Sequence, residues 1–205
     1  MNKSINLPQP RYDGKVSIEK ALLKRRSVRS YKSEPLTISE ISQLLWSAQG
    51  LTGSNRCRTA PSAGALYPLE VYMAAGNVMD VDSGIYKYDP HSHEIGLTIT
   101  GDKRPELCRA GLGQGSIRSA AAVIIFCAVF ERVTGSYGKR GIQYVYMEAG
   151  HAIQNASLQA VALGLGSVVI GAFNDNDVKH ILNLEPDEEP LLLLPVGRHR
   201  PDPKF

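Results

Sequence analysis

The sequence predicts an α+β fold in which a central mixed β-sheet is flanked by helices. Segments with apolar residues at helical spacing are interspersed with short runs rich in Val, Ile and Leu, which are typical of buried strands. These helices and strands do not alternate strictly, as they would around a doubly wound parallel sheet. The chain has 205 residues, enough for a substantial core. We therefore expect a single domain over residues 1–205.

Apolar spacing predicts several helices, and the second of them has the clearest boundaries. Thr37 and Glu40 form a capping box in front of an apolar stripe, and Gly50 and Gly53 end the helix. A loop rich in Gly, Ser, Thr and Pro is expected to follow it. The helices are expected over residues 17–25, 37–50, 103–112, 141–163 and 174–182, and the loop over residues 51–68.

Strands are expected wherever short apolar runs are bounded by turn residues. The run Ala120–Phe130 is continuously apolar, as in a strand that is buried on both faces. It is far shorter than the ~20 residues that a membrane helix needs, and the N-terminal residues contain no apolar core of signal-peptide type. The strands are expected at Leu69–Ala75, Gly84–Tyr88, Glu94–Thr100, Ala120–Phe130, Gly164–Ala172 and Leu191–Val196.

The composition argues against several classes of protein. Lys and Arg number 23 and Asp and Glu 20, and the resulting net charge of +3 is too mild to indicate nucleic-acid binding. The three cysteines are spaced neither as metal ligands nor as a redox pair, so inert thiols in a reducing cytoplasm are expected. Glu148 and His151 have the spacing of half a di-iron helix motif. The chain lacks the other half, so we expect no metal.

A basic cluster follows the first expected helix. Residues 25–31 contain three guanidinium groups and three hydroxyls, and guanidinium groups match phosphate oxygens in bidentate fashion. In an extended chain, Arg25, Ser27 and Arg29 would point the same way. The alternative is a solvated basic helix end that interacts favourably with the helix dipole, and composition alone favours this alternative.

Three further segments are candidates for ligand contact. The loop 60–68 contains small residues that allow close approach to a flat ligand, although an ordinary surface loop fits its composition better. The expected strand that ends at Gly171 and Ala172 would leave backbone N–H groups free at its tip, although a plain core strand is the simpler interpretation. Arg198 and Arg200 suit a phosphate about as well as they suit a solvated cationic tail.

Taken in order, these segments resemble the nitroreductase family of FMN-dependent enzymes. The resemblance runs from about Leu22 to Arg200 and is closest to the SagB-type branch, which includes the dehydrogenases of azole-forming peptide biosynthesis. Each motif is weak alone, and five in sequence are specific. The motifs are RRSVRSY, TAPSAGALYPLEVY, GLGQ, YMEAGHAIQNASLQAVALGLGSVVIGAF and LLLPVGR.

The resemblance implies a set of FMN-binding residues. The first motif would hold the flavin phosphate and the pyrimidine edge of the ring, and the C-terminal arginines would also contact the phosphate. The small-residue loop would cover the isoalloxazine of the other subunit, and the strand tip would lie near N5. A glutamine would complete the site. In this chain the residues are Arg25, Arg26, Ser27 and Arg29; Arg198 and Arg200; Pro61, Ser62, Ala63 and Gly64; Ile170, Gly171 and Ala172; and Gln114.

The resemblance also implies a mechanism and a partner. NADH or NADPH would give a hydride to flavin N5 and leave, and a nitro, quinone or similar small acceptor would then take the electrons. The enzyme would be an obligate homodimer with FMN at its interface. The small-residue face of the helix 141–163, which comprises Ala149, Ala152, Ala156 and Ala160, is expected to meet the other subunit.

Two alternatives to a nitroreductase remain open on the sequence. One is an azoline dehydrogenase that acts on a peptide together with a partner cyclase, in which Tyr137 and Lys139 would transfer protons. The other is a protein that binds flavin without turnover. The sequence does not separate these functions, because substrate contacts in such enzymes lie in variable covering loops.

Overall fold

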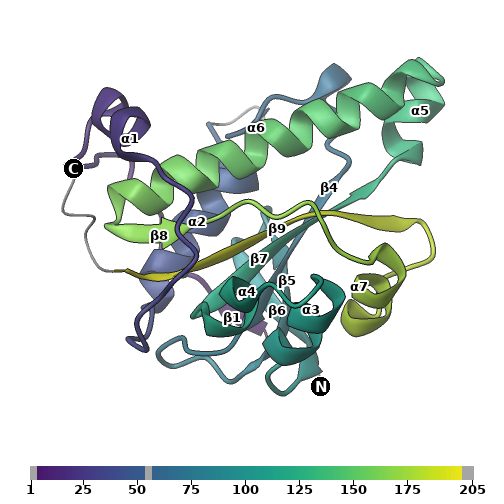
Figure 1. Cartoon of the computed structure of the whole chain (residues 1–205). Coiled ribbons are helices and arrows are strands. Elements are labelled where there is room, and N and C mark those ends of the chain that lie inside the picture. The colour runs from purple at the N-terminus through teal and green to yellow at the C-terminus, as the bar shows by residue number, and fades with distance from the viewer. Residues whose placement is uncertain (1–3, 54–56, 200–205) are drawn as a thin grey trace.

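The computed structural model describes residues 4–53 and 57–199, and a seven-stranded sheet runs through its centre (Figure 1). The strand order is β1-β6-β5-β4-β7-β9-β8. The interior strand β7 is buried along its whole length, as its continuous apolar run predicts. The strands are β1 (Ser4–Asn6), β4 (Leu69–Ala75), β5 (Gly84–Asp89), β6 (Glu94–Thr100), β7 (Ala122–Val129), β8 (Leu165–Ser167) and β9 (Glu188–Arg198), and a separate two-stranded ribbon pairs β2 (Leu51–Thr52) with β3 (Cys57–Arg58).

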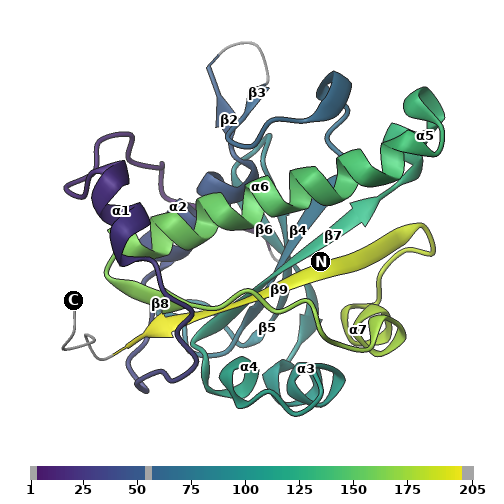
Figure 2. The ribbon, with the colours of Figure 1, turned by 45° about the horizontal axis from the view of Figure 1, so that its top comes forward.

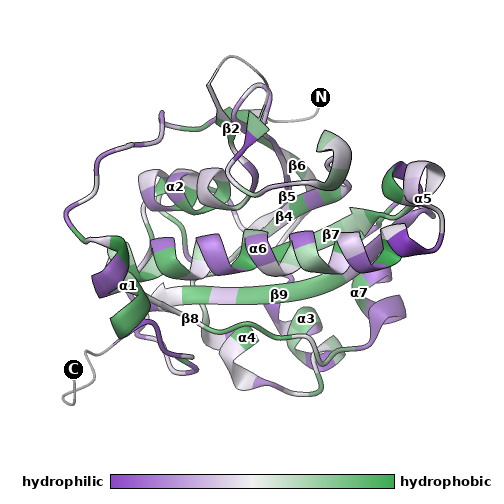
Figure 3. Ribbon diagram, turned by 90° about the horizontal axis from the view of Figure 1, so that it is seen from above, coloured by the Kyte–Doolittle hydropathy of each residue, from purple (hydrophilic) through white to green (hydrophobic). Residues whose placement is uncertain are grey.

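Helices cover both faces of this sheet, which confirms the α+β class. One apolar cluster joins the sheet to α2 and α6, and a second joins its other face to α3, α4 and α7. Figure 3 shows the two helical layers on either side of β9, which is mostly hydrophobic in its colouring. The helices are α1 (Ile18–Lys24), α2 (Ile38–Gln49), α3 (Arg104–Ala110), α4 (Gly115–Ser119), α5 (Glu131–Tyr137), α6 (Arg140–Ala162) and α7 (Asp175–Leu182), with a 3₁₀ turn η1 at Ala63–Ala65.

The start of α2 confirms the capping box. The Glu40 backbone N–H donates to Thr37 Oγ1 at 3.2 Å, and the Thr37 N–H donates to Glu40 Oε2 at 2.8 Å. The apolar stripe behind this cap is fully buried, with Ile41, Leu44 and Leu45 each at 0% exposure. Local capping and the apolar period therefore agree, which is why the beginning of this helix was predictable.

The pairing of the sheet corrects the prediction of a mixed sheet. Every ladder between its named strands runs antiparallel. Within the described ranges, parallel pairing is limited to isolated bridges between Ser27 and Ser167 and between Leu36 and Val78. Apolar runs show that strands are buried, but they do not show in which direction neighbouring strands run.

The expected strand over Gly164–Ala172 is interrupted, and the reason lies in its partner strand. β8 ends at Ser167, and pairing resumes only as an isolated bridge between Ile170 and Leu193 in the same register. Between these two points Val168 donates to the carbonyl of Pro195 at 3.3 Å. Pro195 has no N–H to return that bond, so the ladder is broken there.

The orientation of α6 contradicts the predicted dimer face. Ala149, Ala152, Ala156 and Ala160 are at most 1% exposed and pack in the chain's own core. The helix crosses the sheet from α5 to β8 (Figure 2), and small residues let it lie close to α2 and the strands. Its exposed apolar residues are instead Ile142, Tyr146 and Met147, at 42%, 57% and 51% exposure.

A search of the described residues for membrane-spanning helices is negative. None of the helices there combines the length and the apolar character that crossing a bilayer requires.

Candidate functional site

The basic segment leaves α1 as an extended chain and joins the edge of the sheet. Ser17 caps the start of α1 by accepting a hydrogen bond from the Lys20 N–H at 3.3 Å, and Arg25 ends the helix with extended dihedral angles. The Val28 N–H then donates to the Ser167 carbonyl at 2.9 Å, which adds this segment beside β8. The close approach requires glycine at position 166, because a Cβ there would lie 2.7 Å from a methyl group of Val28.

The side chains of this segment differ in whether they are available to bind a ligand. Ser27 and Arg29 are exposed and Arg25 is half-buried, so these three remain available to a ligand. Arg26 instead folds back on the end of α1, where its Nη1 donates to the carbonyls of Leu23 at 3.0 Å and Arg25 at 2.8 Å. Arg26 therefore caps the helix in this conformation.

Arg198, predicted as a phosphate ligand, lies next to the basic segment. The Lys32 N–H donates to the Arg198 carbonyl at 2.8 Å, so the two segments are neighbours although they are far apart in sequence. The Arg198 guanidinium forms a bidentate pair with Glu40, with Nη1–Oε1 at 2.8 Å and Nη2–Oε2 at 2.9 Å. Glu40 thus orients Arg198 while also capping α2. Arg200 lies outside the described residues.

Tyr31 holds the basic segment against β9. Its hydroxyl lies 2.7 Å from the Val28 carbonyl and 3.0 Å from the Pro195 carbonyl, and its ring packs over Gly197. Burial raises the pKa of Tyr31, and the charge of Arg29 opposes this shift only in part. Tyr31 therefore stays protonated as a hydrogen-bond donor, and its role here is structural.

The segment after β8 brings further predicted residues to the same edge of the sheet. Ile170 is buried, whereas Gly171 and Ala172 are exposed. The Gln114 side chain donates from Nε2 to the Ala172 carbonyl at 3.0 Å, and it also donates to the Gly111 carbonyl at 3.0 Å. Gln114 therefore ties the joint between α3 and α4 to the predicted strand tip.

The loop with Pro61, Ser62, Ala63 and Gly64 adopts an unusual backbone conformation. Positive φ angles occur at Gly64 (61°) and also at two non-glycine residues, Ala65 (53°) and Tyr67 (46°). Non-glycine residues in the left-handed region are strained, and such strain persists only where surrounding contacts hold it. Here Ser62 Oγ accepts a hydrogen bond from the Tyr67 N–H at 2.9 Å.

This loop does not meet the basic segment within one chain. It lies over the first half of α6 near α5, whereas α1 and β8 lie at the opposite end of that helix (Figure 2). α6 has 23 residues, and a helix of that length spans about 35 Å at 1.5 Å per residue. One protomer therefore presents the two predicted parts of the site at separate places on its surface.

A buried carboxyl lies beneath the loop. Glu148 on α6 is only 2% exposed, and His151, its partner in the motif considered above, is exposed. Burial raises the pKa of Glu148 to about 7, against the opposing effects of Ser62, Arg58 and Gln49. Sequence reasoning missed this group because polar pairs on a helix are common. The burial of Glu148 and its neighbours depend on the tertiary structure and cannot be read from the sequence.

A comparison with protein families finds one family model that matches most of the chain. The model described as "Nitroreductase family" matches residues 22–198. The chain belongs to the nitroreductase family, and its fold is that of nitroreductase-family oxidoreductases.

Particular relatives fall into two groups. The chain is 48% identical over 183 residues to the provisionally named nitroreductase MJ1384 of Methanocaldococcus jannaschii, covering 89% of this chain and 91% of that protein. A crystal structure of a provisionally named nitroreductase from Ralstonia eutropha matches with TM-score 0.85 and 31% identity, over 97% of this chain and 90% of that one.

The other group contains peptide-processing proteins. The microcin B17-processing protein McbC of Escherichia coli is 33% identical over 158 residues, which cover 73% of this chain but 57% of McbC. The structure of the McbBCD microcin synthetase with truncated pro-MccB17 bound matches with TM-score 0.76 and 30% identity, over 87% of this chain and 70% of that one.

Proposed function

We propose that this protein is an FMN-dependent oxidoreductase that works as an obligate homodimer. The observation that carries the proposal is the convergence of predicted site residues from four separate stretches of chain. Arg25, Ser27 and Arg29 lie beside β8, Arg198 lies next to them, and Gln114 holds the Ile170–Ala172 segment on the same edge.

The donor set fits a flavin mononucleotide. Within residues 4–53 and 57–199, neither Arg25 nor Arg29 has an ion-pair partner, so both can bind a phosphate or the ring edge. Gly171 is exposed, and the nearest atom to a Cβ built there is 3.6 Å away, which leaves the backbone accessible. Bound FMN would supply hydride transfer at N5, between NADH or NADPH and a nitro, quinone or similar small acceptor, while the chain binds and orients it.

A second subunit accounts for the separation of the two parts of the site. The loop Pro61–Gly64 of one protomer would cover the flavin held by Arg25, Ser27 and Arg29 of the other. The exposed residues Ile142, Tyr146 and Met147 of α6 would form part of the interface, because exposed large apolar side chains that lie close together favour burial. An obligate interface of this kind buries upward of ~2,000 Å². The expected location is the cytoplasm, which suits three unpaired cysteines.

The direct test is the identity and reactivity of the bound flavin. We expect the purified protein to release FMN rather than FAD, because the basic residues suit one phosphate and the chain contains no dinucleotide-binding turn. Mass spectrometry of the released ligand checks this, and stopped-flow bleaching with NADH and with NADPH, followed by a panel of acceptors, checks turnover. Finding FAD, or no flavin after reconstitution, would overturn the proposal. Bound FMN that neither nicotinamide reduces would indicate a binding protein without turnover.

Arg25→Ala is expected to weaken FMN binding about ten- to a hundredfold, because one charge-assisted hydrogen bond contributes roughly 1.5–3 kcal/mol. Titration of the apoprotein with FMN measures the effect. Lys24→Ala is the matched control, since Lys24 is the neighbouring exposed cation and is expected to leave the affinity unchanged. Arg198→Ala should also weaken binding, although it leaves Glu40 without its ion pair as well. Wild-type affinity in Arg25→Ala would mean that the basic segment is solvated surface.

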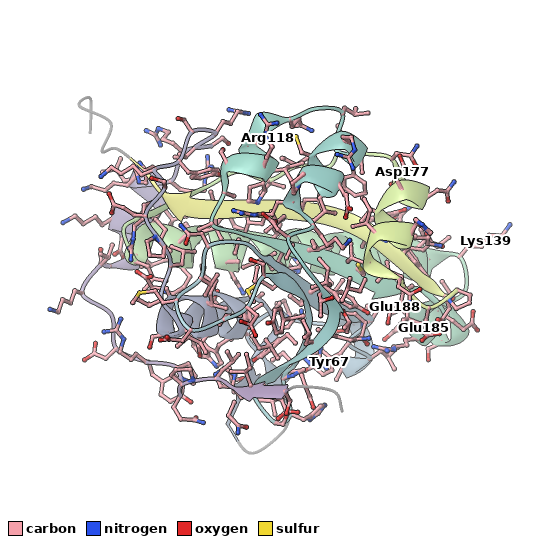
Figure 4. The ribbon with its side chains drawn as sticks, turned by 90° about the horizontal axis from the view of Figure 1, so that it is seen from below. Tyr67, Arg118, Lys139, Asp177, Glu185 and Glu188 are labelled. Atoms are coloured by element: carbon pink, nitrogen blue, oxygen red, sulfur yellow. The ribbon has the colours of Figure 1, made fainter. Side chains whose placement is uncertain are left out.

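A second candidate function is azoline dehydrogenation on a peptide, and the position of Tyr137 favours it. The hydroxyl of Tyr137 lies 2.9 Å from the place that a Cβ on Gly64 would take, so Tyr137 contacts the loop that would cover the flavin. Lys139 is exposed and points away from the body of the molecule (Figure 4), so Tyr137 is the better candidate of the two for proton transfer. An enzyme of this kind should be nearly inert with NAD(P)H and a quinone until its partner protein is added.

A further inference from the structure

The segment 59–67 is held on α6 and α5 at successive points. The Asn155 side chain donates from Nδ2 to the Thr59 carbonyl at 3.1 Å. Two helical turns earlier on α6, Glu148 faces the hydroxyl of Ser62. At the end of α5, Tyr137 lies against Gly64. Contacts with two helices therefore hold a segment that includes three residues with positive φ.

Of these three contacts, the one at Glu148 differs from the others because Glu148 is a buried ionisable group with an unpaired atom. Glu148 Oε1 is fully buried and has no hydrogen-bond partner among the described residues, and the same is true of Gln49 Nε2 on α2. Arg58 on β3, whose positive charge acts on Glu148, donates from Nη1 to Gln49 Oε1 at 2.7 Å, so that bond goes to Gln49 and not to Glu148.

Arg58 also interacts with an aromatic ring and with charged groups other than Glu148. Its guanidinium lies 4.5 Å from the centre of the Tyr67 ring. Burial lowers the pKa of Arg58, and the charges of Glu70 on β4 and of Glu148 oppose that shift, while Arg132 on α5 adds to it. Arg132 is itself paired with Glu70. Arg58 is thus shared between several groups, and Glu148 is incompletely neutralised.

Ser62 connects this carboxyl to the strained part of the loop. Its Oγ accepts from the Tyr67 N–H, so its own hydroxyl proton remains for Glu148. An ionised Glu148 would require that proton, the unpaired Gln49 Nε2–H, the Arg58 guanidinium or water, because a buried carboxylate with an unpaired oxygen is costly. A shift of Ser62 moves the loop directly, and a shift of Gln49 or Arg58 disturbs the hydrogen bond between them, which lies next to the start of the loop. A neutral Glu148 does not need an additional hydrogen-bond donor or cation.

We propose that Glu148 is a positioning residue whose protonation state sets how firmly the segment 59–67 is held on α6. The neutral form holds the segment, and ionisation loosens it. Burial raises the pKa of this carboxyl to about 7 from its usual 4.5, so the change falls near neutral pH. The stabilising effect of the neutral form is complete below pH 4.5 and is lost as the pH rises through 7. The consequence for flavin, weaker covering at high pH, rests on the proposed function.

Trp46 provides a local probe of this segment. It is the one tryptophan of the chain. Its carbonyl accepts from Thr59 Oγ1 at 3.0 Å and its Nε1–H donates to the Leu51 carbonyl at 3.2 Å. We expect Trp46 emission of the purified protein to change between pH 5.5 and 8.5 with a midpoint near 7, and Glu148→Gln to abolish that transition. In the same range the melting temperature of Glu148→Gln should rise relative to wild type as the pH increases.

Three control variants separate Glu148 from other groups and from a merely structural effect. His151→Gln, on the exposed side of α6, and His93→Gln, next to Ser42 on α2, should both keep the transition. Ser62→Ala should keep the pH dependence of the melting temperature, because Glu148 still ionises. It should lose the Trp46 transition, because the hydroxyl that links Glu148 to the loop is removed. A wild-type protein without the transition, a Glu148→Gln protein that keeps it, or its disappearance in either histidine variant would overturn the proposal.

These measurements need no flavin, so they are independent of the proposed function. With FMN, we expect wild-type affinity to be roughly tenfold lower at pH 8.5 than at pH 5.5, the size expected for one weakened contact, and Glu148→Gln to be flat. Equal wild-type affinities at the two pH values would overturn the link between the loop and the flavin. Failure to bind FMN at any pH would overturn the proposed function and leave the Trp46 result to decide the role of Glu148.

Discussion

Ala156→Arg is expected to unfold the chain rather than to separate two subunits. Ala156 is 0% exposed and lies in the core between α6, α2 and the sheet. An arginine there would bring an unpaired charge and a large excess volume into a packed interior, and together these effects cost more than about 4 kcal/mol. Circular dichroism and thermal denaturation would show the loss of the cooperative native transition.

Gly150→Ala is the matched control on the same helix. Gly150 is exposed, and a Cβ built there meets no atom within 4 Å. Alanine is favoured over glycine inside a helix by about 0.5–1 kcal/mol, so this variant should melt at or above the wild-type temperature. A folded Ala156→Arg protein with the native spectrum would contradict the packing of α6 described above.

Met147→Arg is expected to split the proposed dimer and to release flavin in the same step. Met147 is 51% exposed and is one of the three exposed large apolar residues of α6, so a charge there does not disturb the protomer core. In the proposed dimer this position would be buried, and an unpaired charge at an apolar interface strongly opposes association. Each flavin site would need both chains, so the monomer should be colourless. Sedimentation velocity, with absorbance recorded at the protein and flavin bands, measures both effects.

Asn176→Arg controls for the added charge, since Asn176 is an exposed residue of α7 on the other side of the sheet. This variant should remain a yellow dimer. A Met147→Arg monomer that keeps its flavin would refute the shared site, and a yellow dimer would place the interface on another surface of the chain.

Much of the local structure could be predicted because it depends on neighbours in the sequence. Thr37 and Glu40 cap α2 through atoms three residues apart, and the apolar run around β7 is buried as its composition requires. Composition also singled out the basic segment, and its role in binding a ligand stays a prediction. That Arg26 caps α1 while Arg25 and Arg29 remain available depends on local backbone direction, which composition does not contain.

The direction in which a helix faces was predicted wrongly, and the reason is physical. Helical spacing places Ile142 and Tyr146 at the start of the same apolar stripe as Ala149, Ala156 and Ala160. Small residues permit a close contact either with the chain's own core or with another subunit, so the period alone does not decide which of the two this stripe meets. The sheet and α2 take the alanine face, because only small residues let three elements approach closely.

The sequence alone therefore determined the α+β class, the positions of most helices and strands, and the family to which the motifs belong. The tertiary structure decided which distant residues meet. Arg198 pairs with Glu40 across 158 residues of chain, Pro195 on β9 interrupts the strand that leads to Ile170, and Ser62 lies over Glu148. Local propensities act over a few residues, whereas these contacts arise only when the sheet order brings separate segments to one place.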